Sequence, residues 1–122
     1  MGEVSLYREE DSVPSNGFAL TVRFTLRDAS AAQQFDALLS GAIGGIRAEP
    51  GTLAYIVHTP VDEPLVRVFY ELYVDRSAFQ AHEEQGHTKH FLAAREALLT
   101  AVDVTFLDEI GELTKRPGVG GS

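Results

Sequence analysis

The residues of this sequence whose types are best suited to chemistry lie between Thr52 and Phe91. All four histidines of the chain are in this stretch, namely His58, His82, His87 and His90. Glu71 and Tyr73 lie among them. An imidazole exchanges its proton near neutral pH, so a histidine here could take a proton from a phenol. Because the chain has no cysteine, thiolate nucleophiles, disulfides and sulfur-ligated metals are excluded.

The composition is typical of one small globular domain. The 122 residues are 44% hydrophobic and 23% charged, with a net charge of -8 and scattered basic residues. No segment resembles a signal peptide, and no apolar run approaches the roughly twenty residues that span a bilayer. We therefore expect a cytoplasmic protein with no nucleic-acid or membrane partner. A homodimer is expected because a small domain gains buried surface by pairing.

Three strands that would position these residues are marked by alternating apolar side chains. In residues 18–26 the alternation places Arg23 opposite the apolar face, and in residues 52–58 His58 shares a face with Ile56. The third strand covers residues 65–74, and we expect helices to cover one of its faces. That face holds Val66, Val68, Tyr70, Leu72 and Val74, and the inward face holds Leu65, Arg67, Phe69, Glu71 and Tyr73.

A first helix should follow the first strand, with Asp28 or Ser30 as its N-cap. Apolar residues at helical spacing run from Phe35 to Ile46. The glycines at positions 44 and 45 are expected to loosen or end this helix.

A second helix should follow the third strand, capped by Asp75 or Ser77. Gly86 interrupts it, and Thr88 is a candidate cap for its continuation. The continuing apolar stripe contains one arginine, whose stem can lie along apolar surface. The stripe consists of Phe91, Leu92, Arg95, Leu98, Leu99 and Val102, and a final strand should follow near Val104, Phe106 and Ile110.

The element order βαββαβ fits a ferredoxin-like α+β fold, with an antiparallel sheet and both helices on one face. We place this domain at residues 17–114, between a flexible N-terminal arm of residues 1–16 and a disordered tail of residues 115–122. The other sheet face needs a cover, and a second subunit is the simplest one. Two facing sheets would close a dimeric α+β barrel lined by the polar strand residues.

Several short motifs in this region are shared with a known family. They are Glu49-Pro50-Gly51 with Leu53 and Tyr55, then residues 69–73 (FYELY) with Asp75, and Ala81-His82 with His87 and Phe91. In these motifs the chain resembles the antibiotic biosynthesis monooxygenase family over roughly residues 18–113. The resemblance implies a dimeric α+β barrel. The implied activities include metal-free and flavin-free oxygenation of polycyclic phenols, haem degradation and isomerisation of small phosphorylated sugars, and some members have no known role.

The chain departs from two branches of that family. The aromatic-oxidising and haem-degrading members use a pocket tryptophan, and this chain has none. Tyr73 stands where a strand tryptophan often occurs, and His82 stands where the haem degraders place theirs. Leu92 occupies the position of their ligating histidine, with His90 nearby. These departures disfavour haem degradation.

We therefore expect a cofactor-independent monooxygenase-like oxidoreductase that uses molecular oxygen on a small aromatic or polyketide-type phenol in the barrel pocket. His58 is the candidate base, Tyr73 would stabilise the anion, and Glu71 would orient the reacting groups. The predicted substrate-binding residues are Arg23, Arg67, Phe69, His82 and Phe91.

Each assignment has a structural alternative. His58 could be an exposed strand-end residue, Glu71 could pair with Arg67, and Arg23 could form an ion pair between subunits. The histidines suggest a metal site, yet Gly86 breaks their register and no carboxylate motif accompanies them, so no metal is expected. For the whole chain, the alternative is a dimer that binds a small hydrophobic molecule without chemistry. A haem-binding protein is a further, weaker alternative.

Overall fold

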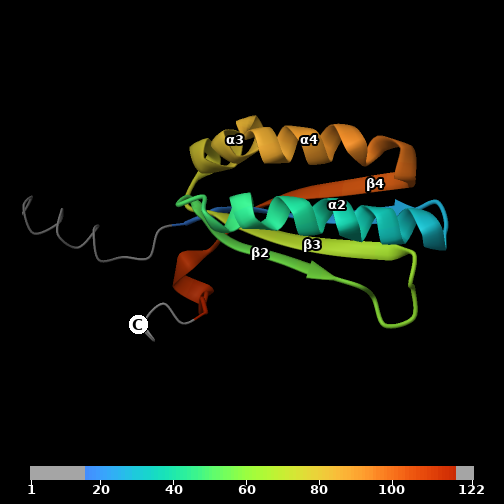
Figure 1. Ribbon diagram of the computed structural model, residues 1–122. Coiled ribbons are helices and arrows are strands. Elements are labelled where there is room, and N and C mark those ends of the chain that lie inside the picture. Colours follow the sequence, from blue (N-terminus) through green and yellow to red (C-terminus); the bar gives the residue numbers. More distant parts are fainter. Residues whose placement is uncertain (1–15, 118–122) are drawn as a thin grey trace, which may run out of the picture.

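The computed structural model describes residues 16–117, which form a four-stranded antiparallel sheet with helices on one face (Figure 1). The expected arm and tail lie outside the described residues, apart from residue 16 and residues 115–117. The elements are β1 (Phe18–Leu26), α2 (Ala29–Arg47), β2 (Thr52–His58), β3 (Val66–Tyr73), α3 (Arg76–Glu84), α4 (Gly86–Ala94) and β4 (Leu99–Asp108). The strand order β2-β3-β1-β4 confirms the ferredoxin-like α+β fold.

The core lies between the sheet and the helices and is built around aromatic rings. Phe24 of β1 contacts Phe35 of α2 and Phe69 of β3, with ring centroids 5.1 and 4.8 Å apart. Phe91 of α4 completes the group, 5.4 Å from Phe35. Edge-on aromatic contacts of this kind add to the free energy gained by burial. They fix which face of each strand is turned to the helices.

The register shows that the predicted orientation of β3 is wrong. Leu20 of β1 pairs with Glu71 and Val22 pairs with Phe69, and paired residues of neighbouring strands point to the same side. Phe69, Glu71 and Tyr73 therefore face the helices. The other side of β3 carries Val68, Tyr70 and Leu72. Both sides of this strand are rich in apolar residues, so alternation alone does not distinguish them, and the contact of Phe69 with the aromatic core decides.

Helix α2 begins as predicted but continues through its two glycines. Asp28 is the N-cap, and its carboxylate accepts a hydrogen bond from the Ala31 backbone N–H at 2.8 Å. The helix reaches Arg47, and Ile46 in its last turn is buried in the core. A Cβ at Gly45 would collide with the ring of His87, so this glycine allows two helices to approach closely.

The second helical segment is divided in two at Gln85. Asp75 caps α3 by accepting a hydrogen bond from the Ala78 backbone N–H at 2.8 Å. Gln85 has an extended backbone, and α4 starts directly after it at Gly86. The prediction that Thr88 caps this helix is wrong, because its side chain is buried within α4.

The apolar stripe of α4 ends earlier than the sequence predicts. The helix stops at Ala94, and a single turn of 3-10 helix at Glu96–Leu98 leads into β4. Leu99 and Val102 therefore belong to the strand, where they pair with β1. Apolar residues at positions 98, 99 and 102 fit helical spacing as well as a strand preceded by a turn, so their pattern was ambiguous.

The face of the sheet opposite the helices carries no α-helix among residues 16–117. Ile56 of β2 and Leu107 of β4 are exposed there. One end of this face is approached by the turn Gly111–Leu113 and the residues after it, where Arg116 donates a hydrogen bond to Glu109 at 2.9 Å. None of the helices between residues 16 and 117 is long and apolar enough to cross a membrane.

Candidate active site

A cavity of about 170 Å³ lies between the sheet and the helices α3 and α4. Its wall is largely aromatic, formed by Tyr55, Phe69, Phe79, Phe91 and Phe106. Three charged side chains, those of Glu71, Glu83 and Arg95, also line it. A mostly apolar cavity with a few converging polar groups is the usual form of a small-molecule site.

Glu71 and Tyr73 form a buried hydrogen-bonded pair at this cavity. The Tyr73 hydroxyl donates to Glu71 Oε1 at 2.6 Å, and the two residues are 0% and 6% exposed respectively. Burial raises the pKa of the Glu71 carboxyl because it disfavours the charged form, and this outweighs the opposing effect of the Tyr73 hydrogen bond. Burial and the Glu71 charge also raise the pKa of Tyr73, which therefore stays protonated. A carboxyl group in this setting is suited to general acid–base chemistry.

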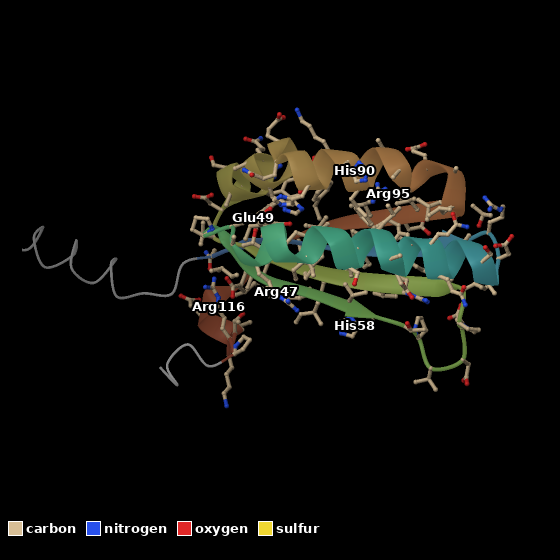
Figure 2. All side chains as sticks on the ribbon, viewed as in Figure 1. Arg47, Glu49, His58, His90, Arg95 and Arg116 are labelled. Atoms are coloured by element: carbon tan, nitrogen blue, oxygen red, sulfur yellow. The ribbon has the colours of Figure 1, made fainter. Side chains whose placement is uncertain are left out.

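Arg95 is the second charged group of the cavity. Its guanidinium carbon lies 4.9 Å from the centre of the Phe24 ring and 5.7 Å from that of Phe91. Figure 2 shows it between α4 and the sheet. Its Nε is buried and has no hydrogen-bond partner among residues 16–117. Burial lowers the pKa of Arg95. The sequence predicts only a packed stem for this residue, whereas the structure also buries part of its charged head.

Four of the predicted site residues lie at the cavity. Phe69, Glu71 and Phe91 line the cavity, and Tyr73 supports Glu71 from behind. Tyr55 also lines the cavity and belongs to the motif region, but its type and position alone did not single it out. The cavity therefore contains part of the predicted site together with residues that the sequence pattern did not reveal.

Two other predicted residues, Arg23 and His58, lie on the open side of the sheet. His58 is exposed at the end of β2, with its Nδ1 3.1 Å from the backbone oxygen of Val68, and Figure 2 shows it away from the helices. Arg23 donates to Glu63 at 2.6 Å. The sheet separates these residues from Glu71. A molecule bound in the cavity of one chain cannot contact both groups.

Arg67 ties β3 to α2 and does not pair with Glu71. Its Nε and Nη2 donate to the two oxygens of Asp36, each at 2.9 Å. This bidentate contact raises the pKa of Arg67. The alternative of an Arg67–Glu71 pair is wrong because residues four apart in a strand are about 13 Å apart along the chain. Substrate binding by Arg67 remains a prediction.

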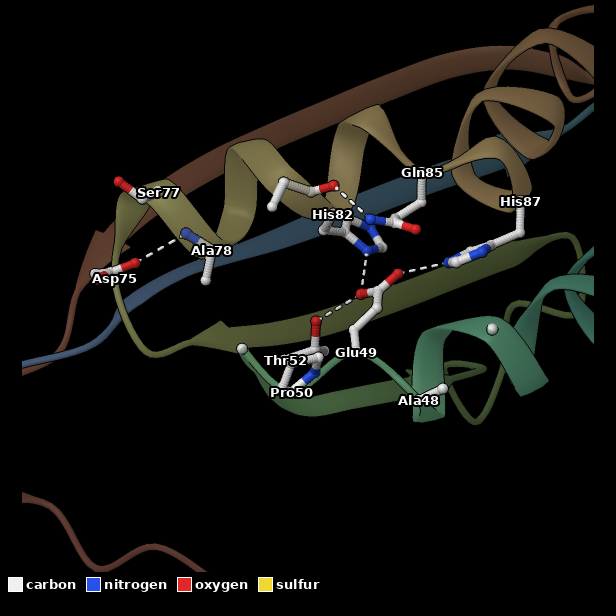
Figure 3. A pocket seen from close by; sticks show the side chains of 13 residues that line it. Ala48, Glu49, Pro50, Thr52, Asp75, Ser77, Ala78, His82, Gln85 and His87 are labelled. Carbon is white, nitrogen blue, oxygen red and sulfur yellow. Dashed lines mark hydrogen bonds and ion pairs between the residues drawn. The ribbon is translucent and has the colours of Figure 1, made fainter.

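A second polar cluster surrounds Glu49 in the turn after α2 (Figure 3). Its Oε1 accepts hydrogen bonds from Thr52 at 2.6 Å and from His82 Nδ1 at 2.8 Å, and its Oε2 lies 2.5 Å from His87 Nε2. Burial acts to raise the pKa of Glu49, but the bonds from Thr52, His87 and His82 together lower it. An open cleft of about 640 Å³ adjoins the cluster. One carboxylate thus connects the α2–β2 turn with α3 and α4.

His82 belongs to this cluster and lies behind the cavity. Its side chain is 5% exposed, and its ring centre lies 5.3 Å from that of Tyr73 and 5.8 Å from that of Tyr55. It lines the cleft near Glu49, so its predicted contact with substrate remains a prediction. Within residues 16–117 no group of three histidine, aspartate or glutamate side chains is arranged to hold a metal ion.

The strand order and helix placement define a ferredoxin-like α+β domain, and its aromatic cavity is a candidate small-molecule site. Residues 18–96 match the antibiotic biosynthesis monooxygenase family, and the chain belongs to this family. It is similar to Rv0793 from Mycobacterium tuberculosis, with 31% identity and a TM-score of 0.73 over 80% of this chain and 99% of that one.

Two further solved structures have the same fold. PA3566 from Pseudomonas aeruginosa is 25% identical, with a TM-score of 0.71 over 79% of this chain and 96% of that one. A Caulobacter crescentus protein described as a candidate antibiotic biosynthesis monooxygenase is 20% identical, with a TM-score of 0.72 over 84% of this chain and 98% of that one. No curated protein matches the sequence.

Proposed function

We propose that this protein is a monooxygenase-type enzyme that oxidises a small electron-rich phenol in the cavity between the sheet and α3–α4. Family membership supports oxygenase chemistry. The observation that carries the proposal is the buried Glu71–Tyr73 pair at an aromatic cavity. The pair supplies a proton acceptor, and the rings supply a surface that fits a flat substrate.

In the proposed first step, the Glu71 carboxylate takes the proton of the phenol hydroxyl. Burial raises the pKa of Glu71 and so brings it closer to that of a phenol, which lies near 10 for a tyrosine side chain in water. A smaller pKa difference makes the proton transfer less unfavourable. Tyr73 holds one carboxylate oxygen by its hydrogen bond, and in the proposed step the other oxygen takes the proton.

The phenolate then reacts with molecular oxygen. It gives one electron to oxygen, and the resulting phenoxyl radical and superoxide combine to form a carbon–oxygen bond. Glu71 returns its proton to the peroxide. Loss of the ring hydrogen and cleavage of the oxygen–oxygen bond then leave a quinone and water. The substrate supplies all the electrons, so one phenol and one oxygen molecule account for one quinone and one water without a cofactor.

The cavity volume favours a single-ring substrate. An apolar cavity of about 150 Å³ is enough to hold benzene, and this one measures about 170 Å³. A polycyclic phenol would require Phe79 or Phe106 at the cavity wall to move. We therefore expect one-ring phenols and quinols to be turned over before polyketide-type compounds.

We also propose that the protein acts as a homodimer in which two open sheet faces meet. Ile56 and Leu107 on that face are 43% and 36% exposed, and the outer strand β4 carries Phe106 at 56% exposure. An apolar sheet face and an unpaired edge are unfavourable in water and favour association. His58 and Arg23 would lie at this interface.

Oxygen consumption by the purified protein with a panel of one-ring phenols and quinols tests the proposed function. Uptake of one oxygen molecule per quinone formed is expected. Saturable binding of a phenol without oxygen uptake would instead support a binding protein. In that alternative the same aromatic cavity holds the ligand without reaction. Lack of both binding and uptake across the panel would contradict the use of this cavity.

A further inference from the structure

We propose that the natural substrate of this cavity is a hydroxyaryl carboxylate, whose carboxylate is bound by Arg95. This inference rests on the proposed function, because it takes the hydroxyl at the other end of the same molecule to be the group that Glu71 deprotonates. The proposal requires a negative charge on the substrate. Neither family membership nor the Glu71 base requires such a charge.

The basis is that the Arg95 guanidinium has no hydrogen-bond or ion-pair partner within residues 16–117. Arg23, Arg67 and Arg116 each donate to a carboxylate. Among residues 16–117, Arg95 has no hydrogen bond and no ion pair, although its Nε is buried. A buried charge without a partner is unfavourable. Such a group is therefore well placed to gain from a ligand that brings a negative charge.

The surroundings of Arg95 hold its charge at the cavity without using its donors. Phe24 and Phe91 contact the guanidinium through their rings, which accept no N–H bond from Nε. A guanidinium has five N–H donors in a planar fork that matches the two oxygens of a carboxylate. The aromatic walls fit a ring next to that carboxylate.

In the described part of the chain, no carboxylate forms an ion pair with Arg95. Glu96, Glu71 and Glu83 are close enough to raise the pKa of Arg95 through their charge, opposing the effect of burial. None of the three lies within ion-pair distance of it in the part of the chain that the structure describes. Glu71 is held by the Tyr73 hydroxyl. Glu71 and Arg95 thus offer two complementary contacts in one cavity, a proton acceptor and an anion binder.

Calorimetric binding of 4-hydroxybenzoate and of its neutral analogue 4-hydroxybenzamide tests the inference under anaerobic conditions. We expect the wild-type protein to bind the carboxylate at least about tenfold more tightly, as a charge-assisted bidentate contact implies. Arg95→Met should abolish this preference while it retains binding of the amide. Retained amide binding also shows that the variant is folded.

Arg76→Met is the matched control. The Arg76 guanidinium lies 4.4 Å over the ring of Phe18, so the substitution removes the same charge and the same kind of ring contact outside the cavity. This variant should keep the wild-type preference for the carboxylate. If Arg95→Met does not fold, Arg95→Gln provides the same test with a polar side chain of similar length.

Equal binding of the two probes by the wild type would overturn the inference, and so would an unchanged preference in the Arg95 variants. In either case oxygen uptake with neutral phenols would still support the proposed function. If neither probe binds, the inference also fails. Absence of oxygen uptake with every phenol as well would then remove the proposed function too.

Discussion

At the scale of single residues, the environment of Glu71 determines its chemistry. Its carboxyl is buried beside Tyr73 and shares the cavity with Arg95. The same side chain on the open side of the sheet would be solvated and would have an ordinary pKa. The chemistry of Glu71 therefore depends on its position in the fold. The strand register turns its side chain toward the helices and buries it there.

The raised pKa of Glu71 predicts how stability depends on pH. The folded state holds this proton more tightly than the unfolded state, so the stabilising contribution is complete below the unfolded pKa and is lost as pH rises through the folded pKa. Glu71→Gln has no ionisable group at this position, so it lacks this loss of stability at higher pH. The free energy of unfolding of the variant, measured with urea, should increase relative to wild type as pH rises. A difference that does not change with pH would show that burial does not perturb this group.

At the scale of elements, the Glu49 cluster holds α3 and α4 against the turn after α2. Glu49→Gln should destabilise the protein by about 1–3 kcal/mol at neutral pH, because it weakens bonds to three buried or half-buried donors. The pKa of Glu49 is lowered, so its stabilising effect is present above the unfolded pKa and is lost as pH falls through the folded pKa.

Denaturation of Glu49→Gln and of a control measures this effect. Glu84→Gln removes an equivalent charge from an exposed pair with Lys89, so it should change stability little. The difference between Glu49→Gln and wild type should shrink in acid. Equal effects of the two substitutions at neutral pH would contradict a structural role for the cluster.

Two glycines of α2 test the close contact between α2 and α4. Replacing an exposed helical glycine with alanine normally stabilises a protein by about 0.5–1 kcal/mol. Gly44→Ala should do so because a Cβ there meets no other atom within 4 Å. Gly45→Ala should instead destabilise, because the new Cβ would collide with the His87 ring. Thermal unfolding of the two variants should therefore shift in opposite directions, and parallel shifts would contradict the close helix contact.

At the scale of the whole molecule, the order of elements could be predicted from the sequence, but part of the site could not. Alternation in residues 18–26 and 52–58 is clear, and Asp28 and Asp75 both act as the caps that their positions suggest. In β3 both faces are apolar enough for a core, so the positions of Glu71 and Tyr73 depend on packing between distant segments. For Arg95 the helical stripe predicts only a packed stem, and the burial of its Nε depends on the aromatic core being in place.

The open sheet face predicts a dimer that can be disrupted at one position. Ile56→Lys places a charge on this face and should convert a dimer to a monomer in sedimentation velocity experiments at micromolar concentration. Val61→Lys adds the same charge to a fully exposed loop residue and should leave the dimer intact. A monomeric wild-type protein would contradict the proposed pairing of the sheets.

If Glu71 acts as the base for phenol oxidation, the rate of oxygen uptake should depend on its carboxylate, and Glu71→Gln removes that carboxylate. This variant should lose at least about 10²-fold in rate, as expected for loss of a general base, while it still binds the phenol. Glu63→Gln removes an exposed carboxylate that pairs with Arg23 away from the cavity, and it should keep the wild-type rate. Oxygen uptake at the wild-type rate by folded Glu71→Gln would show that Glu71 is not the base.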